Sequence, residues 1–334
     1  MNQKILIVGP AWVGDMMMAQ VLFQLLCQQN PAVELHVLAP AWCEALLSRM
    51  PEVKKSIVLP FAHGQFELLA RRRFAQQLKA EQYNQAIVLP NSFKSALIPF
   101  FADIPKRTGW VGESRYGLLN DSRRLDKKAL PKMIQRFAAL AFPSASVLPT
   151  ELPTPKLTVD AEALNASLQK HGLTPSAQPI LALCPGAEFG PSKCWPDSHY
   201  AYVANQKIRA GWAVWIFGSH KDAAIADRIQ SRTQQQCVNL CGKTTLSEAV
   251  DLLSLANYVV TNDSGLMHIA SALDRPLIAV YGSTSPDFTP PLSSKAKIIK
   301  KHLACQPCFE RICPLKHHHC MQLLSPDSVL QAME

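Results

Sequence analysis

The sequence lacks long apolar runs, which excludes an integral membrane protein with spanning helices. No segment approaches the roughly 18 consecutive apolar residues that a membrane-spanning helix needs. Residues 1–5 lead directly into a strand-like pattern, without the layout of a signal peptide. We therefore expect a cytoplasmic location.

The sequence also lacks the two familiar glycine-rich phosphate loops. In residues 9–15, Gly9 and Gly14 have Walker A spacing, but Asp15 stands where the lysine should be and would repel phosphate. Two glycines are also too few for the dinucleotide fingerprint, which disfavours a dinucleotide oxidoreductase. Residues 241–244 end like a Walker A loop, but position 237 is cysteine instead of glycine. Neither segment predicts a phosphate loop.

A third absence concerns metal chemistry. The chain has no Asp-x-Asp pair of the kind that holds a divalent cation against a sugar diphosphate. If such a substrate binds, its charge must be met by a lysine and by helix N-termini.

The apolar residues that are present predict two α/β domains. The chain has 334 residues, 48% of them hydrophobic, which is enough for two packed cores. Its strand-like runs are continuously apolar, as in parallel sheets that are covered on both faces. They fall at residues 5–8, 35–38, 57–59 and 86–89, and then at residues 180–184, 213–217, 258–261 and 277–281.

Prolines mark the domain boundary. Four of them fall between residues 143 and 155, which predicts a linker near residues 143–157. We therefore expect doubly wound domains at residues 1–157 and 158–324, with a ligand cleft between them, and a terminal helix at 325–334. A helical stretch at residues 160–170 could belong to either domain.

Positive charge is concentrated in the first domain. The chain carries a net +9, and residues 1–160 carry +7 of it (19 Lys and Arg against 12 Asp and Glu). This favours an anionic partner: a phosphorylated substrate, a membrane surface or nucleic acid, although solubility alone is an alternative. Residues 71–73, three arginines, are a candidate membrane-surface patch, but we favour a solvated helix face.

The strand ending at residue 261 leads into the most informative turn. Asp263, Ser264 and Gly265 lie between this strand and an amphipathic helix pattern, where free backbone N–H groups can hold a phosphate. Asp263 and His268 flank the turn and could hydrogen-bond a sugar or nucleotide. An ordinary Asn-Asp helix cap with a surface histidine is an equally weighted alternative.

Two further residues are candidates for chemistry. Lys193 is the one cation in the Pro- and Gly-rich loop 184–196 and could neutralise a diphosphate leaving group, or it could be a solvated surface lysine. Asp15 begins a helix whose dipole keeps it ionised, so it could act as a general base or simply cap the helix.

Four of the ten cysteines are gathered in a tail at residues 305–320. Cys305, Cys308, Cys313 and Cys320 stand beside three consecutive histidines, residues 317–319. In a reducing compartment such a cluster predicts structural zinc in preference to disulfides, with reduced, metal-free thiols as the alternative.

Several long motifs, in matching order from residue 5 to about residue 297, resemble the lipopolysaccharide heptosyltransferases of glycosyltransferase family 9. Trp12 and residues 91–97 favour, within that family, the members that add the second heptose. The segments that carry the resemblance are residues 9–18, 89–97, 107–110, 115–121, 184–196, 261–268 and 285–292.

The resemblance implies an activity and a fold. It implies the two-domain GT-B architecture and transfer of L-glycero-D-manno-heptose from ADP-heptose to the first heptose of the inner core. It further implies inversion at the anomeric carbon, with no cofactor and no catalytic metal.

Site residues follow from the resemblance position by position. Asp15 would be the general base. The ADP diphosphate and donor sugar would be held by Lys193, Asp263, Ser264, Gly265 and His268. Thr244 and Asp222 would contact the nucleoside, and we expect Lys94, Arg107 and Arg115 to contact the acceptor.

The implied partners are ADP-heptose and heptosyl-Kdo2-lipid A, met at the inner face of the bacterial inner membrane, with no nucleic acid. The sequence leaves the oligomeric state open. Alternatives are another transferase of the family, such as one adding the first heptose or a different sugar, and a non-catalytic protein that binds anionic lipid or nucleic acid.

Overall fold

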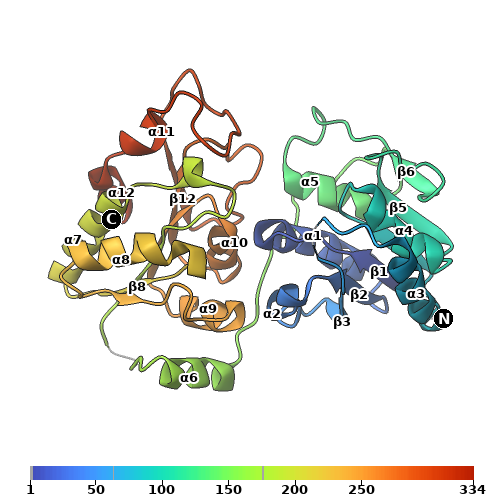
Figure 1. Ribbon diagram of the computed structural model, residues 1–334, viewed down its shortest axis with the longest axis horizontal. Helices are drawn as coiled ribbons and strands as arrows, with labels where there is room; N and C mark the ends of the chain where they lie inside the picture. The colour runs from blue at the N-terminus through green and yellow to red at the C-terminus, as the bar shows by residue number, and fades with distance from the viewer. Residues whose placement is uncertain (1–2, 63, 175–176) are drawn as a thin grey trace. The chain divides into compact units, whose positions relative to one another are not determined.

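The computed structural model describes residues 3–62, 64–174 and 177–334. The chain divides into two compact units, Met1–Pro155 and Lys156–Glu334, each built on one six-stranded sheet (Figure 1). None of the helices in the described ranges is long and apolar enough to cross a membrane.

The first unit is a doubly wound α/β domain. Every neighbouring pair of strands is parallel, and the strand order is β3-β2-β1-β4-β5-β6. Successive strands are added to one side of β1 up to β3 and to its other side from β4 onward. The topological switch point therefore lies between β1 and β4. Its main elements are β1 (Lys4–Val8), α1 (Val13–Gln29), β2 (Glu34–Ala39), α2 (Glu44–Leu47), β3 (Val53–Val58), α3 (Leu68–Leu78), β4 (Gln85–Val88), α4 (Phe93–Phe101), β5 (Lys106–Trp110), β6 (Asp121–Arg123) and α5 (Met133–Ala138).

The second unit repeats this topology with new strands. Its order, β12-β11-β10-β7-β8-β9, is the same winding, and its switch point lies between β7 and β10. Its main elements are α6 (Ala161–Lys170), β7 (Ile180–Cys184), α7 (Asp197–Arg209), β8 (Ala213–Ile216), α8 (Ala223–Arg232), β9 (Val238–Asn239), α9 (Leu246–Leu253), β10 (Tyr258–Asn262), α10 (Gly265–Ala272), β11 (Leu277–Tyr281), β12 (Ala296–Lys300), α11 (His319–Gln322) and α12 (Pro326–Ala332).

The predicted fold class of two tandem doubly wound domains is confirmed. The runs in β7 and β11 are apolar because both faces of a central parallel strand are covered, and all five residues of each strand are buried. The strand expected at residues 57–59 is instead β3, Val53–Val58.

Polar strands were missed for a physical reason. β5 begins with Lys106 and Arg107, so it has no apolar run to signal a strand. Its buried Thr108 is satisfied by side chains on both sides: Gln85 Nε2 donates to its hydroxyl over 2.9 Å, and the hydroxyl donates to Asp121 Oδ2 over 2.9 Å. Neighbouring strands thus provide the hydrogen-bond partners of this polar strand, and the sequence of β5 alone does not show them.

The boundary between the units falls between residues 155 and 156, inside the predicted linker. The helix at residues 160–170, which could have belonged to either domain, lies in the second unit as α6. Its N-cap, Asp160, accepts a hydrogen bond from Ala163 N over 2.8 Å. Leu157 N donates to Ala272 O over 3.2 Å and fixes the start of this unit.

Candidate active site

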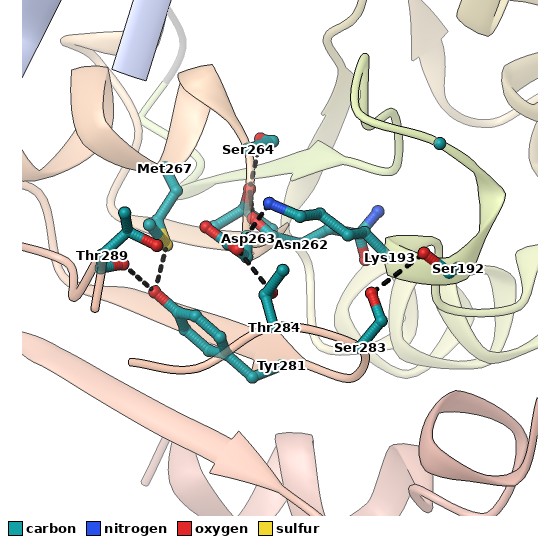
Figure 2. A network of polar contacts seen from close by, with 12 residues as sticks. Ser192, Lys193, Asn262, Asp263, Ser264, Met267, Tyr281, Ser283, Thr284 and Thr289 are labelled. Atoms are coloured by element: carbon teal, nitrogen blue, oxygen red, sulfur yellow. Dashed lines mark hydrogen bonds and ion pairs between the residues drawn. The ribbon is translucent and has the colours of Figure 1, made fainter. Parts of the chain in front are cut away.

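The switch point of the second unit carries a compact polar network. Lys193, in the loop after β7, donates from Nζ to Asp263 Oδ2 over 2.6 Å, and Thr284 Oγ1 donates to the same oxygen over 2.6 Å (Figure 2). The Lys193 and Asp263 side chains are only 13% and 4% exposed. The solvated-lysine alternative is therefore wrong, and two residues predicted to hold the donor lie together.

Asn262, the last residue of β10, braces the loops around this network. Its Nδ2 donates to Pro185 O over 2.6 Å. Its Oδ1 accepts from Trp195 N over 3.1 Å and from the Tyr200 hydroxyl over 3.0 Å. The side chain is fully buried, and a buried amide must have its partners. This bracing role of Asn262 was not predicted, although a polar residue at the end of an apolar strand is a usable signal.

The N-terminus of α10 follows this turn directly. Its N-cap is Ser264, with extended φ and ψ of −145° and 174°, and Ser264 makes no side-chain cap hydrogen bond. The Ser264 hydroxyl lies 3.3 Å from Thr261 Oγ1 instead. The first-turn N–H groups from Gly265 onward therefore have no cap side chain, and the helix dipole favours negative charge there. The Asn-Asp cap alternative is wrong in its choice of residue.

His268 lies inside the unit and not on its surface. It is 5% exposed, and burial lowers its pKa to about 4; the Asp263 carboxylate opposes this shift and the Lys193 ammonium adds to it. The imidazole is consequently neutral at pH 7. It can offer one N–H donor to a ligand, but no positive charge.

The tail packs directly on the Lys193 loop. The Ser192 hydroxyl pairs with the Ser283 hydroxyl at 2.9 Å (Figure 2). It also donates to Glu310 O over 2.5 Å. Ser192 N donates to Arg311 O over 3.2 Å. At Gly190, φ is +153°, and an added Cβ would lie 2.5 Å from Arg311 O, so this close approach requires glycine. Tertiary contacts alone reveal that the tail holds the lysine loop.

Four cysteines and two histidines of the tail line one small cavity with Ser192 and Ser283: Cys305, Cys308, Cys313, Cys320, His317 and His318. All ten cysteines of the chain are free thiols. Burial raises the pKa of Cys320, and the other three tail thiols raise it further. Across residues 3–62, 64–174 and 177–334, however, no group of three or more His, Cys, Asp or Glu side chains is arranged to hold a metal ion. Zinc therefore stays a prediction.

The two predicted nucleoside contacts lie at the same end of the second sheet. The Asp222 carboxylate accepts from Ser219 N over 2.7 Å and from the Ser219 hydroxyl over 2.8 Å. It also lies against the loop after β7, since a Cβ on Gly186 would come within 2.3 Å of its Oδ1. Thr244 lies in the loop between β9 and α9, next to Thr245, the N-cap of α9.

Asp15 occupies the switch point of the first unit. It is the third residue of α1, directly beyond β1, and it is partly buried. The N-cap of α1 is Trp12, which makes no side-chain cap hydrogen bond and is 45% exposed. A carboxylate in the first helical turn is stabilised in its ionised form by the dipole.

The three predicted acceptor contacts are placed differently. Lys94, in the first turn of α4, lies at the carboxyl edge of the sheet, as Asp15 does; its Nζ donates to Gln65 O over 3.4 Å. Arg107 is the second residue of β5 and lies near the opposite, amino edge. It donates to the carbonyls of Ile104 and Leu118, both over 2.6 Å.

Arg115 is a structural residue in this conformation. It is 2% exposed, and burial lowers its pKa to about 10. Its guanidinium donates to Pro90 O over 2.6 Å, to Asn91 Oδ1 over 3.4 Å and to Trp110 O. These bonds hold together the loops that follow β4 and β5. In this structure both guanidinium groups, Arg107 and Arg115, are engaged by protein oxygens, so their contact with the acceptor stays a prediction.

Two parallel sheets, each with polar groups gathered at its switch point, define a two-domain α/β enzyme of the GT-B glycosyltransferase type. Comparison with known proteins agrees with this class. The sequence profile described as Glycosyltransferase family 9 (heptosyltransferase) matches residues 71–319.

Individual relatives are similar over most of their length. Lipopolysaccharide heptosyltransferase 2 of Salmonella typhimurium is 52% identical over 89% of this chain and 88% of its own. Lipooligosaccharide heptosyltransferase 2 of Haemophilus influenzae is 53% identical, with the same coverage. The structure of E. coli ADP-heptose LPS heptosyltransferase II matches with a TM-score of 0.90 and 45% identity, over 99% of this chain and 97% of that one. The chain belongs to glycosyltransferase family 9, the heptosyltransferases.

The buried, neutral His268 predicts a pH dependence of stability. The unfolded chain protonates this imidazole near pH 6.5, the folded chain only near pH 4. Stability is therefore lost as pH falls from about 6.5 to about 4, by up to roughly 3 kcal/mol, because the unfolded state binds the extra proton. Denaturant unfolding of His268→Gln between pH 7 and pH 4 should show a shallower loss than the wild type. The exposed His302→Gln is the control, and equal slopes in all three proteins would contradict this assignment.

Proposed function

We propose that the protein transfers L-glycero-D-manno-heptose from ADP-heptose to the first heptose of the lipopolysaccharide inner core, with inversion and without a metal. The observation that carries this proposal is the Lys193–Asp263 network beside the N-terminus of α10. A buried lysine beside a helix N-terminus at a sheet's switch point supports diphosphate binding there. Relatives that share half of this sequence are named heptosyltransferase 2.

On the donor side, the lysine and the helix act together. Lys193 would keep its hydrogen bond to Asp263 and direct another ammonium N–H to an oxygen of the β-phosphate, while Thr284 keeps its hydrogen bond to the carboxylate. The N–H groups after Ser264 would meet the same diphosphate, and these donors would stabilise the departing ADP. Asp222 and Thr244, at the same end of the sheet, would contact the nucleoside.

On the acceptor side, Asp15 would act as the general base. It would take the proton of the acceptor hydroxyl as that oxygen attacks the anomeric carbon from the face opposite ADP. The C–O bond to ADP breaks as the new glycosidic bond forms, and inversion results. Lys94, at the same edge of the first sheet, would meet the phosphorylated acceptor.

The proposed acceptor, heptosyl-Kdo2-lipid A, is a membrane glycolipid. We therefore propose that the enzyme works as a peripheral protein at the cytoplasmic face of the inner membrane. The net charge of +7 on residues 1–160 supports contact with this anionic surface.

The acceptor preference can be measured directly. The purified protein should transfer heptose from ADP-heptose to a Kdo2-lipid A acceptor that already bears one heptose, and not to the heptose-free acceptor. Product mass spectrometry reads out both reactions. Use of the heptose-free acceptor would contradict the assignment, and no heat with millimolar ADP in calorimetry would favour a non-catalytic binding protein.

The role of Asp15 is tested by Asp15→Asn. Loss of a general base should lower turnover by roughly 100-fold or more, while ADP binding measured by calorimetry stays near the wild-type value. Glu44→Gln changes an exposed carboxylate in the first turn of α2 and is the matched control, expected to keep full turnover. Wild-type turnover in Asp15→Asn would contradict the general-base role and leave Asp15 as a helix-capping residue.

We also propose that the tail thiols hold a structural zinc ion and take no part in the reaction. Thiolate and imidazole are the ligands zinc prefers, and four cysteines with two histidines share one cavity. The side chains would have to draw closer around the ion, because no ready ligand set exists among the residues that the structure describes.

Metal analysis of the purified protein tests this site. About one zinc per chain is expected, and it should be lost in the Cys305→Ser/Cys308→Ser variant, with a lower Tm. Cys27→Ser, a single cysteine outside the tail, should keep both the metal and the Tm. Metal-free wild-type protein whose four tail thiols all react promptly with a thiol reagent would rule the zinc site out.

A further inference from the structure

The start of α3 carries large apolar side chains that point to solvent. Leu69 is 69% exposed, Phe66 50% and Leu68 41%. Scattered single exposures of this kind are ordinary, but three within four residues concentrate exposed apolar area in one short segment. Such a surface marks an interaction site, since leaving it in water forfeits the free energy of burial.

A buried arginine fixes the backbone of the segment directly before α3. Arg71 is 3% exposed, its Nε donates to Phe66 O over 2.7 Å, and its Nη2 donates to Gln65 O over 3.1 Å. Its guanidinium lies 4.3 Å from the centre of the Phe61 ring. The favoured interpretation of residues 71–73 as a solvated helix face is thus wrong for Arg71. Its side chain clamps the segment before α3 in one conformation.

The same helix face is basic. Arg72 and Arg73 are exposed and lie four residues beyond Leu68 and Leu69, so each pair shares one side of α3. Glu67, the exposed N-cap of α3, supplies one opposing carboxylate. The face therefore has an apolar first turn, followed one turn later by a cationic segment.

This surface lies near the carboxyl edge of the first sheet. α3 follows β3 and α4 follows β4, so both helices begin at the carboxyl edge of the sheet, where Asp15 also lies. The two helices pack against each other, as Figure 1 also shows. Across this contact the Phe66 ring stacks on Phe93, with centroids 6.4 Å apart.

We propose that Phe66, Leu68, Leu69, Arg72 and Arg73 form an interfacial patch that docks on an anionic lipid bilayer. Apolar side chains enter the boundary between headgroups and acyl chains, and the arginines pair with lipid phosphates. A nucleic acid would engage the arginines but leave the leucines and the phenylalanine in water, which is why a bilayer fits better. The proposal deepens the peripheral location proposed above by naming the surface that makes the contact.

Vesicle co-sedimentation tests the patch without donor or acceptor present. The full-length protein should bind vesicles of phosphatidylglycerol and phosphatidylcholine more tightly than vesicles of phosphatidylcholine alone. Arg72→Gln/Arg73→Gln should lower the partition coefficient on the anionic vesicles by roughly tenfold or more, from two lost arginine contacts. Leu68→Ser/Leu69→Ser should lower it comparably and should also remove the binding that persists at high salt.

Two controls match these variants. Lys127→Gln/Lys128→Gln removes two exposed charges elsewhere in the unit, and Val147→Ser removes an exposed apolar side chain, 93% exposed. Both should bind vesicles as the wild type does. If patch and control variants lose vesicle binding equally, the overall charge of the unit drives binding, and the proposal of a specific patch is overturned. It is equally overturned if the arginine variant loses duplex DNA binding but keeps vesicle binding.

An activity assay separates this proposal from the proposed function. With a water-soluble acceptor that lacks the acyl chains, the patch variants should turn over as fast as the wild type. With the acceptor embedded in vesicles, they should be slower, mainly through a higher apparent KM. Absence of any transferase activity in the wild type would overturn the function and leave the vesicle result standing.

Discussion

The ion pair between Lys193 and Asp263 is the constraint around which the second unit is organised. It joins the loop after β7 to the turn after β10, the two neighbouring strands between which the winding order of the sheet reverses. Because both charges are largely buried, each needs the other, and removing either would strand an unpaired charge. Thr284 donates to the Asp263 carboxylate, while Asn262 and the tail fix the loop that carries Lys193. The site is therefore pre-organised before any ligand arrives.

One topology carries two different sets of polar groups in this chain. Both sheets have the same strand order, yet the first switch point carries a carboxylate, Asp15, and the second carries a cation and a helix N-terminus. The sheet fixes where a ligand can bind, while loop residues decide what it can be. A carboxylate in the first turn of α1 suits an acceptor hydroxyl, and a lysine in the loop after β7 suits a diphosphate.

Much of the site was predictable from the chain. The strands that end at Val8, Cys184 and Asn262 are apolar enough to be recognised, so the residues directly after them could be placed at sheet edges. Arginines were harder to interpret. The sequence does not distinguish an arginine that binds a phosphate from one that is buried against backbone carbonyls. Arg115 and Arg71 are of the second kind. Only the surrounding loops determine which occurs, and the loops come from distant parts of the sequence.

The sequence by itself determined the two-domain α/β architecture, the turn around Asp263 and the family, because apolar periodicity and long motifs are local properties. The tertiary structure decided which polar groups meet. It paired Lys193 with Asp263 across 70 residues, buried His268 as a neutral imidazole, and packed the cysteine tail on the lysine loop. Burial and pairing depend on segments that are distant in sequence and close in space, and local pattern carries no record of that proximity.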